Sequence, residues 1–66
     1  MKRGDFIRYL NKNSCYLLRE GANHSIFQNE KNKKQTAVGR HPELSDLLCQ
    51  KICTQLEIPD IKGAKR

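Results

Sequence analysis

The sequence predicts a small α+β domain with the element order α-β-β-β-α, in which a three-stranded antiparallel sheet carries both helices on one face. Three observations lead to this prediction. Apolar residues recur at helical spacing near each end of the chain, short strand-like runs lie between them, and polar turn-forming clusters separate the runs. The chain has 66 residues, which is enough for one hydrophobic core and one domain.

The first helix is expected over residues 2–13. Phe6, Ile7 and Leu10 form a single apolar stripe at helical spacing. The polar run at residues 11–14 should end this helix, because short polar side chains compete for backbone hydrogen bonds.

Three strands are expected, at residues 15–19, 24–28 and 35–38. Gly21, which is able to take a positive φ, lies in the turn between the first two strands, and the polar residues 29–34 should form a hairpin tip. In the second strand the two-residue period places one set of side chains on one face (His24, Ile26, Gln28) and the other set on the opposite face (Ser25, Phe27).

A second helix is expected between Pro42 and Pro59, because the apolar spacing becomes helical from Glu43 onward. Ser45 is the candidate N-cap of this helix. Its core-facing stripe is predicted from leucine and isoleucine spacing to be Leu44, Leu47, Leu48, Ile52 and Leu56. The domain is expected to extend over residues 1–61, and residues 62–66 to form a basic tail.

The composition favours an anionic partner. Lys and Arg number 13 against 7 Asp and Glu, which gives a formal net charge of +6. Such a balance points to nucleic acid ahead of a membrane surface. No apolar run approaches the roughly 18 residues that a membrane-spanning helix needs, so a cytoplasmic protein without membrane contact is expected.

The cysteine pattern does not indicate a disulfide framework, because three cysteines are an odd number at no secretory spacing. Cys49 and Cys53 have the spacing of a zinc knuckle, but they lie within the helical pattern. Small buried thiols are therefore the preferred interpretation, and no metal or cofactor is expected.

His24 is the candidate catalytic residue, because it directly follows a tight turn and begins a strand. An imidazole accepts and donates protons near neutral pH. RNA carries its own nucleophile, the 2′-hydroxyl, so one placed imidazole could assist its cleavage without a metal. The alternative is that His24 is an ordinary surface residue; His41, directly before Pro42, is interpreted as a loop residue.

Basic side chains form the candidate phosphate-binding surface, although the same charges could simply keep a small protein soluble. Tyr16 and Phe27 could stack on bases, but Phe27 at least is expected to pack in the core. The candidate RNA-binding residues are Arg19, Lys31, Lys33, Lys34 and Arg40.

Over roughly residues 1–58 the chain resembles the HicA toxin family, the mRNA-cleaving half of bacterial HicAB toxin–antitoxin pairs. The most specific element is Gly21-Ala22-Asn23-His24-Ser25-Ile26-Phe27, a G-x-x-H-x-I-aromatic stretch. It is accompanied by the N-terminal segment 1–10, by Tyr16-Leu17-Leu18-Arg19-Glu20 before the turn, and by Arg40-His41-Pro42-Glu43-Leu44 before an amphipathic helix.

The resemblance implies a fold like that of a double-stranded-RNA-binding domain and an endoribonuclease whose single essential histidine corresponds to His24. It also implies a HicB-type antitoxin that covers this histidine, and DNA binding only through that antitoxin. The chain departs from the family at three places: many members have Gly and a large aromatic residue at the positions of Ser14 and Cys15, a small residue near Leu47, and a Gly near Glu57.

Two other functions stay open on the sequence. The first is a small module of the same fold that binds structured RNA without cutting it. The second is a zinc-stapled DNA-binding module, which metal analysis of the purified protein would test.

Overall fold

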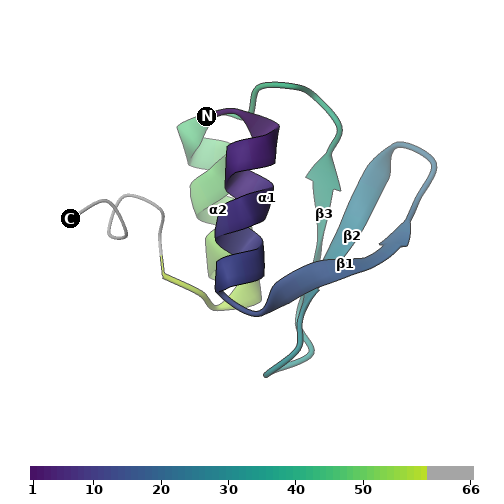
Figure 1. Ribbon diagram of the computed structural model, residues 1–66, viewed down its shortest axis with the longest axis vertical. Helices are drawn as coiled ribbons and strands as arrows, with labels where there is room; N and C mark the ends of the chain where they lie inside the picture. Colours follow the sequence, from purple (N-terminus) through teal and green to yellow (C-terminus); the bar gives the residue numbers. More distant parts are fainter. Residues whose placement is uncertain (60–66) are drawn as a thin grey trace.

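The structure is a computed structural model and describes residues 1–59. The elements follow one another as α1 (Arg3–Lys12), β1 (Cys15–Glu20), β2 (His24–Asn29), β3 (Gln35–Gly39) and α2 (Asp46–Leu56). The predicted α+β class and the α-β-β-β-α order are confirmed (Figure 1). Ile61, which was included in the expected domain, and the basic tail 62–66 lie outside the described residues.

The three strands form one antiparallel sheet in the order β1-β2-β3, so β2 is central. Both helices lie on the same side of this sheet (Figure 1). Along β2, buried residues alternate with more accessible ones: Ser25, Phe27 and Asn29 are buried on the helix side. The predicted two-residue period is therefore confirmed, and the side chain of His24 belongs to the opposite side.

We call this opposite side the open face. Residues that pair directly across an antiparallel sheet share a face. The register therefore adds the partners of the exposed β2 residues to the open face. Together, the open face consists of Tyr16, Arg19, His24, Ile26, Gln28, Gln35, Ala37 and Gly39.

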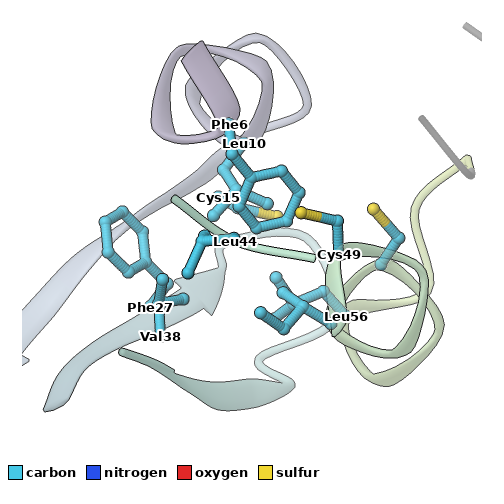
Figure 2. Packing of buried hydrophobic residues seen from close by; sticks show 10 residues of the cluster. Phe6, Leu10, Cys15, Phe27, Val38, Leu44, Cys49 and Leu56 are labelled. Carbon is cyan, nitrogen blue, oxygen red and sulfur yellow. The ribbon is translucent and has the colours of Figure 1, made fainter. Parts of the chain in front are cut away.

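The hydrophobic core lies between the helices and the buried face of the sheet (Figure 2). Phe6 and Leu10 of α1 meet Phe27 and Val38 of the sheet there. All three cysteines are buried within this cluster and none of them forms a disulfide, which confirms them as small core residues. The fully assembled core is Phe6, Leu10, Cys15, Phe27, Val38, Leu44, Cys49, Ile52, Cys53 and Leu56.

The predicted stripe of the second helix is wrong in part. Leu47 is 63% exposed and Leu48 39% exposed, while Leu44 is buried but precedes the helix. The helix begins at Asp46 because Ser45 caps it, with its Oγ accepting a hydrogen bond from the Leu48 N–H at 3.1 Å. The face that turns toward the sheet repeats at i, i+3, i+4 and i+7, and it consists of Cys49, Ile52, Cys53 and Leu56.

The first residues of the chain pair with the segment before α2. The Arg3 N–H donates to the Pro42 carbonyl at 2.9 Å, and the Leu44 N–H donates to the Met1 carbonyl at 2.8 Å. Lys2 and Glu43 form an isolated antiparallel bridge between these two hydrogen bonds. The segment between β3 and α2 is thus tied by backbone hydrogen bonds to the start of α1.

Among residues 1–59, three residues other than glycine have positive φ: Ser14 (66°), Lys33 (64°) and Glu57 (58°). Ser14 joins α1 to β1, and Glu57 is the left-handed C-cap of α2. The left-handed region strains a residue that has a Cβ and suits glycine.

Candidate active site

His24 is the first residue of β2 and is exposed on the open face, where neither helix covers it. Within residues 1–59 its imidazole makes no hydrogen bond or ion pair. Its ring nitrogens are therefore available to a ligand. The residue is held in place by its backbone instead, through pairing with Gly39 of β3 and through the turn that precedes it.

That turn is closed by a hydrogen bond from the Gly21 N–H to the His24 carbonyl at 2.7 Å. Gly21 does not use the positive φ that is open to glycine. Glycine is needed here for space: a Cβ at this position would lie 3.0 Å from the His24 carbonyl oxygen. Because that contact is to backbone, a side chain at residue 21 would have to displace the start of β2.

Arg40 braces the turn from the far end of β3. Its guanidinium donates to the Gly21 carbonyl at 2.6 Å, to the Ala22 carbonyl at 3.0 Å and to the His24 carbonyl at 3.3 Å. It also forms an ion pair with Glu20, with Nη2 2.6 Å from Oε1. This candidate phosphate ligand is therefore engaged by the protein, and its hydrogen bonds position His24.

Glu20 connects this brace to the helix layer. Its carboxylate accepts a second hydrogen bond from the Ser25 hydroxyl at 2.7 Å, and Arg3 donates to the same hydroxyl oxygen at 3.0 Å. Arg3 also donates from Nε to the Gly39 carbonyl at 2.7 Å. The hydrogen bond from Arg40, and then that from Ser25, lowers the pKa of the Glu20 carboxyl from its ordinary value.

The remaining candidate cations fall into two groups. Arg19 is on the open face opposite Ile26. It is therefore a diagonal neighbour of His24, and such neighbours are usually separated by about 7–8 Å, with their Cβ atoms somewhat closer. Its side chain is exposed and has no partner in the described part of the chain. It is the free cation among the candidates that is nearest to His24 along the sheet.

The three lysines lie elsewhere. Lys31, Lys33 and Lys34 are in or beside the β2–β3 hairpin tip, which follows the opposite end of β2 from His24. The length of β2 puts about 17 Å between the two ends, at the usual rise per strand residue. All three are exposed, and Lys34 lies 3.7 Å from the carboxylate of Glu57. The tip is thus a basic surface separate from the histidine.

The two aromatic residues considered for base stacking lie in different environments. Phe27 is 3% exposed and belongs to the core, as expected, whereas Tyr16 is 47% exposed on the open face. Tyr16 is opposite Gln28, at the end of the sheet nearer the hairpin tip.

The thiols are not placed for chemistry. Burial raises the pKa of the Cys15 and Cys49 thiols, which disfavours the nucleophilic thiolate. Within residues 1–59 no three His, Cys, Asp or Glu side chains gather in a group that could hold a metal ion. Neither described helix is long and apolar enough to cross a membrane.

No protein-family model, curated protein or solved structure matches this chain. The site therefore has to be interpreted from its own residues.

Sequence reasoning found His24, its turn and Arg40, but it missed Arg3, Glu20 and Ser25. Their hydrogen bonds join the ends of four elements and depend on the register of the sheet. The sequence does contain one signal for the neighbours of His24, which is the hairpin between β2 and β3. If residues 29–34 form its tip, residue 28 pairs with residue 35, and continuing the pairing places residue 39 opposite residue 24. That count identifies the residues around His24.

Proposed function

We propose that this protein is an endoribonuclease that cleaves mRNA without a metal ion, and that it is the toxin of a HicA-type toxin–antitoxin pair acting in the cytoplasm. The observation that carries the proposal is the placement of His24, which is exposed on the open face while its backbone is braced by Arg40 and Gly21. A histidine with free ring nitrogens and a fixed backbone suits acid/base work on a large, flexible substrate.

The resemblance gains independent support from backbone geometry. It associates glycine with the position of Ser14 and with the neighbourhood of Glu57, and both of these residues have positive φ. Glycine is the residue that takes this conformation without strain. The positive φ values of Ser14 and Glu57 support the proposed family, although the chain has no glycine at these two positions.

The chemistry needs little beyond the imidazole. In RNA the 2′-hydroxyl attacks the adjacent phosphorus and the 5′-oxygen leaves, so a placed imidazole that moves one of these protons accelerates the step about 10²–10⁴-fold. Arg19, exposed and unpaired within residues 1–59, is positioned on the same face to contact the phosphate. DNA lacks the 2′-hydroxyl, so the same site would leave it uncut.

The deciding experiment is an RNA cleavage assay in the presence of a chelator, with the wild type beside His24→Ala. We expect cleavage by the wild type and its loss in the variant. Circular dichroism and thermal unfolding should show that the variant is folded, because within residues 1–59 the exposed imidazole has no hydrogen bond or ion pair to lose. Equal cleavage by a folded His24→Ala protein would contradict the proposal.

A second candidate is a module that binds structured RNA without cutting it, and one observation favours it. The basic hairpin tip with Lys31, Lys33 and Lys34 is separate from His24, so the chain has a basic surface that does not involve the histidine. Intact RNA after incubation with the wild type, together with salt-dependent binding, would favour this module over the nuclease.

The proposed antitoxin partner has a suitable surface on β1. This strand is at an edge of the sheet, and Tyr16, Leu17 and Leu18 are between 45% and 49% exposed. A groove beside it is lined by Ile7 of α1 together with Tyr16 and Leu17. An apolar free edge accepts an added strand or an apolar side chain, and β1 ends at Glu20, beside the histidine turn. A HicB-type antitoxin bound there would reach His24.

A further inference from the structure

The geometry points to His41 as a second acid/base group in the site of His24, so that two imidazoles act on one phosphodiester. This inference rests on the proposed ribonuclease function and adds to it a residue that the sequence pattern treats as part of a loop. It is carried by three observations: the position of the His41 ring, the fixing of its backbone on both sides, and the absence of any competing partner within residues 1–59.

The ring position follows from Gly39. Gly39 pairs directly with His24 across β2 and β3, so a side chain at residue 39 would stand beside that of His24 on the open face. His41 lies next to that space: its Cδ2 is 3.6 Å from where a Cβ of Gly39 would be, which is an ordinary van der Waals distance. Paired Cβ atoms are about 4.5–5.5 Å apart, which brings His41 Cδ2 within about 9 Å of His24 Cβ.

Glycine at residue 39 leaves the surface beside both histidines without a side chain. A Cβ there would neighbour His24 across the strand pair and would touch the His41 ring. With no side chain, this surface is bare backbone, which a phosphate group can approach closely. Both imidazoles therefore stand beside an accessible backbone segment.

His41 is fixed on both sides although it lies outside regular secondary structure. On one side, the Arg40 guanidinium bonds to the carbonyls of Gly21, Ala22 and His24. On the other, the Pro42 carbonyl accepts the Arg3 N–H at 2.9 Å. The same turn that holds His24 thus holds the residue before His41, so the two histidines share one support.

The two rings are also free to act. Both histidines are exposed, and within residues 1–59 neither side chain has a hydrogen bond or ion pair. Two such groups can divide the proton transfers of RNA cleavage. One imidazole takes the proton of the 2′-hydroxyl as its oxygen bonds to phosphorus. The other, as imidazolium, gives a proton to the 5′-oxygen as its bond to phosphorus breaks. The products are a 2′,3′-cyclic phosphate and a 5′-hydroxyl, and no water is consumed.

The first test compares His24→Ala, His41→Ala and His41→Gln with the wild type on an RNA oligonucleotide. We expect each histidine variant to lose cleavage about 100-fold or more, while binding of a 2′-O-methyl RNA and the unfolding midpoint stay near the wild type. His41→Gln keeps most of the side-chain volume, so its loss separates chemistry from packing. Thr54→Ala, on the exposed part of α2, should cleave as the wild type does.

The second test uses RNA in which sulfur replaces the 5′-bridging oxygen at the cleavage site. A thiolate leaves without a proton, so this substrate no longer needs the general acid. We expect one of the two histidine→Ala variants to recover most of its activity and the other to stay inactive, which would also assign the acid and the base.

The outcomes separate this inference from the proposed function. If His24→Ala is inactive while both His41 variants cleave normally, the second group is wrong and the ribonuclease stands. If both histidine→Ala variants are inactive but neither recovers on the sulfur substrate, the division of roles is overturned. If the wild type cleaves no RNA, the ribonuclease function fails and the inference fails with it.

Discussion

The guanidinium of Arg40 donates to the carbonyl oxygen of Gly21 at 2.6 Å, so the segment after β3 holds the turn before β2. These residues are 19 positions apart in the sequence. This contact links the candidate catalytic histidine to the far strand of the sheet. It also gives Arg40 a structural role in place of the free phosphate-binding role that its charge indicates.

Substitution of Arg40 should therefore reduce stability as well as cleavage. We expect Arg40→Ala to destabilise the domain by about 1 kcal/mol, the usual worth of exposed charge-assisted hydrogen bonds. Arg40→Lys should recover little, because an ammonium cannot bond several carbonyls with one planar fork. Urea unfolding and RNA cleavage measure the two effects.

Arg19→Ala is the matched control for Arg40, since it removes an exposed arginine without a partner in residues 1–59. We expect it to weaken RNA binding and to leave the unfolding midpoint unchanged. Equal unfolding midpoints for Arg40→Ala and Arg19→Ala would show that the brace does not support the turn.

Acid should weaken the domain through Glu20. The hydrogen bond from Arg40, and next that from Ser25, lowers the pKa of this carboxyl below its ordinary value of 4.5. The ionised carboxylate therefore stabilises the folded chain above the unfolded pKa, and this contribution is lost as the pH falls through the lower folded pKa. Thermal unfolding measured from pH 6 down to about pH 2, which covers the usual acid-titration range of carboxyl groups, should show a shallower acid decline for Glu20→Gln than for the wild type.

The control for that prediction is Glu30→Gln. Glu30 is exposed at the hairpin, and its side chain has no partner in the part of the chain that the structure describes. Its variant should follow the wild-type acid decline. Identical declines for Glu20→Gln and the wild type would contradict the assigned hydrogen bonds.

The basic hairpin tip should contribute to RNA affinity. We expect replacement of Lys31, Lys33 and Lys34 by alanine to weaken binding of a 2′-O-methyl RNA. The slope of log affinity against log salt should fall by about 2, because each lost contact to single-stranded RNA removes about 0.7. Fluorescence anisotropy over a salt series measures it. Lys51→Ala on α2 serves as control, and an unchanged slope in the triple variant would exclude the tip from the binding surface.

Glu57→Gly should stabilise the protein. Glu57 ends α2 with φ 58°, and the left-handed conformation strains any residue with a Cβ. We expect the free energy of unfolding to increase by about 1 kcal/mol, which raises the midpoint of thermal unfolding by about 4–8 °C for a domain of this size. Glu57→Ala loses the exposed contact to Lys34 but keeps the strain, so it should give no gain. A lower midpoint for the glycine variant would contradict this account.

The corrected face of α2 can be tested with two leucines. Leu56 is fully buried, so Leu56→Ala should cost about 2–5 kcal/mol of the free energy of unfolding. Leu47 is 63% exposed, and Leu47→Ala should change the free energy of unfolding by no more than about 0.5 kcal/mol. Chemical denaturation of the two variants distinguishes them, and a large loss at Leu47 would restore the stripe expected from leucine spacing.

Local patterns were enough to predict the strands and the first helix. Polar–apolar alternation along residues 24–28 and the turn formers on either side are local signals, and α1 differs from its expected range by a single residue at each end. The predicted core-facing stripe of α2 was partly wrong because not all of the most apolar residues of this helix face the core. Cys49 and Cys53 are small enough to fit where α1 approaches, and they take core positions that leucine spacing assigned to Leu47 and Leu48.

The candidate site was also predictable only in part, because most of its contacts are between residues far apart in the sequence. His24 stands out because it follows a glycine turn directly. His41, Arg3 and Ser25 are near it only because of strand register and the pairing of the chain start with the segment before α2. Such contacts carry no signature within a short window of sequence.

The hydrogen bonds between residues 1–3 and residues 42–44 span most of the described chain. Loop closure over that length has an entropic cost that must be met before the contact forms. The first helix therefore cannot complete its docking until the segment before α2 has been synthesised and the hairpin between them has folded. Since that segment also carries His41, assembly of the site is coupled to this long-range contact, and a chain interrupted before residue 44 cannot form it.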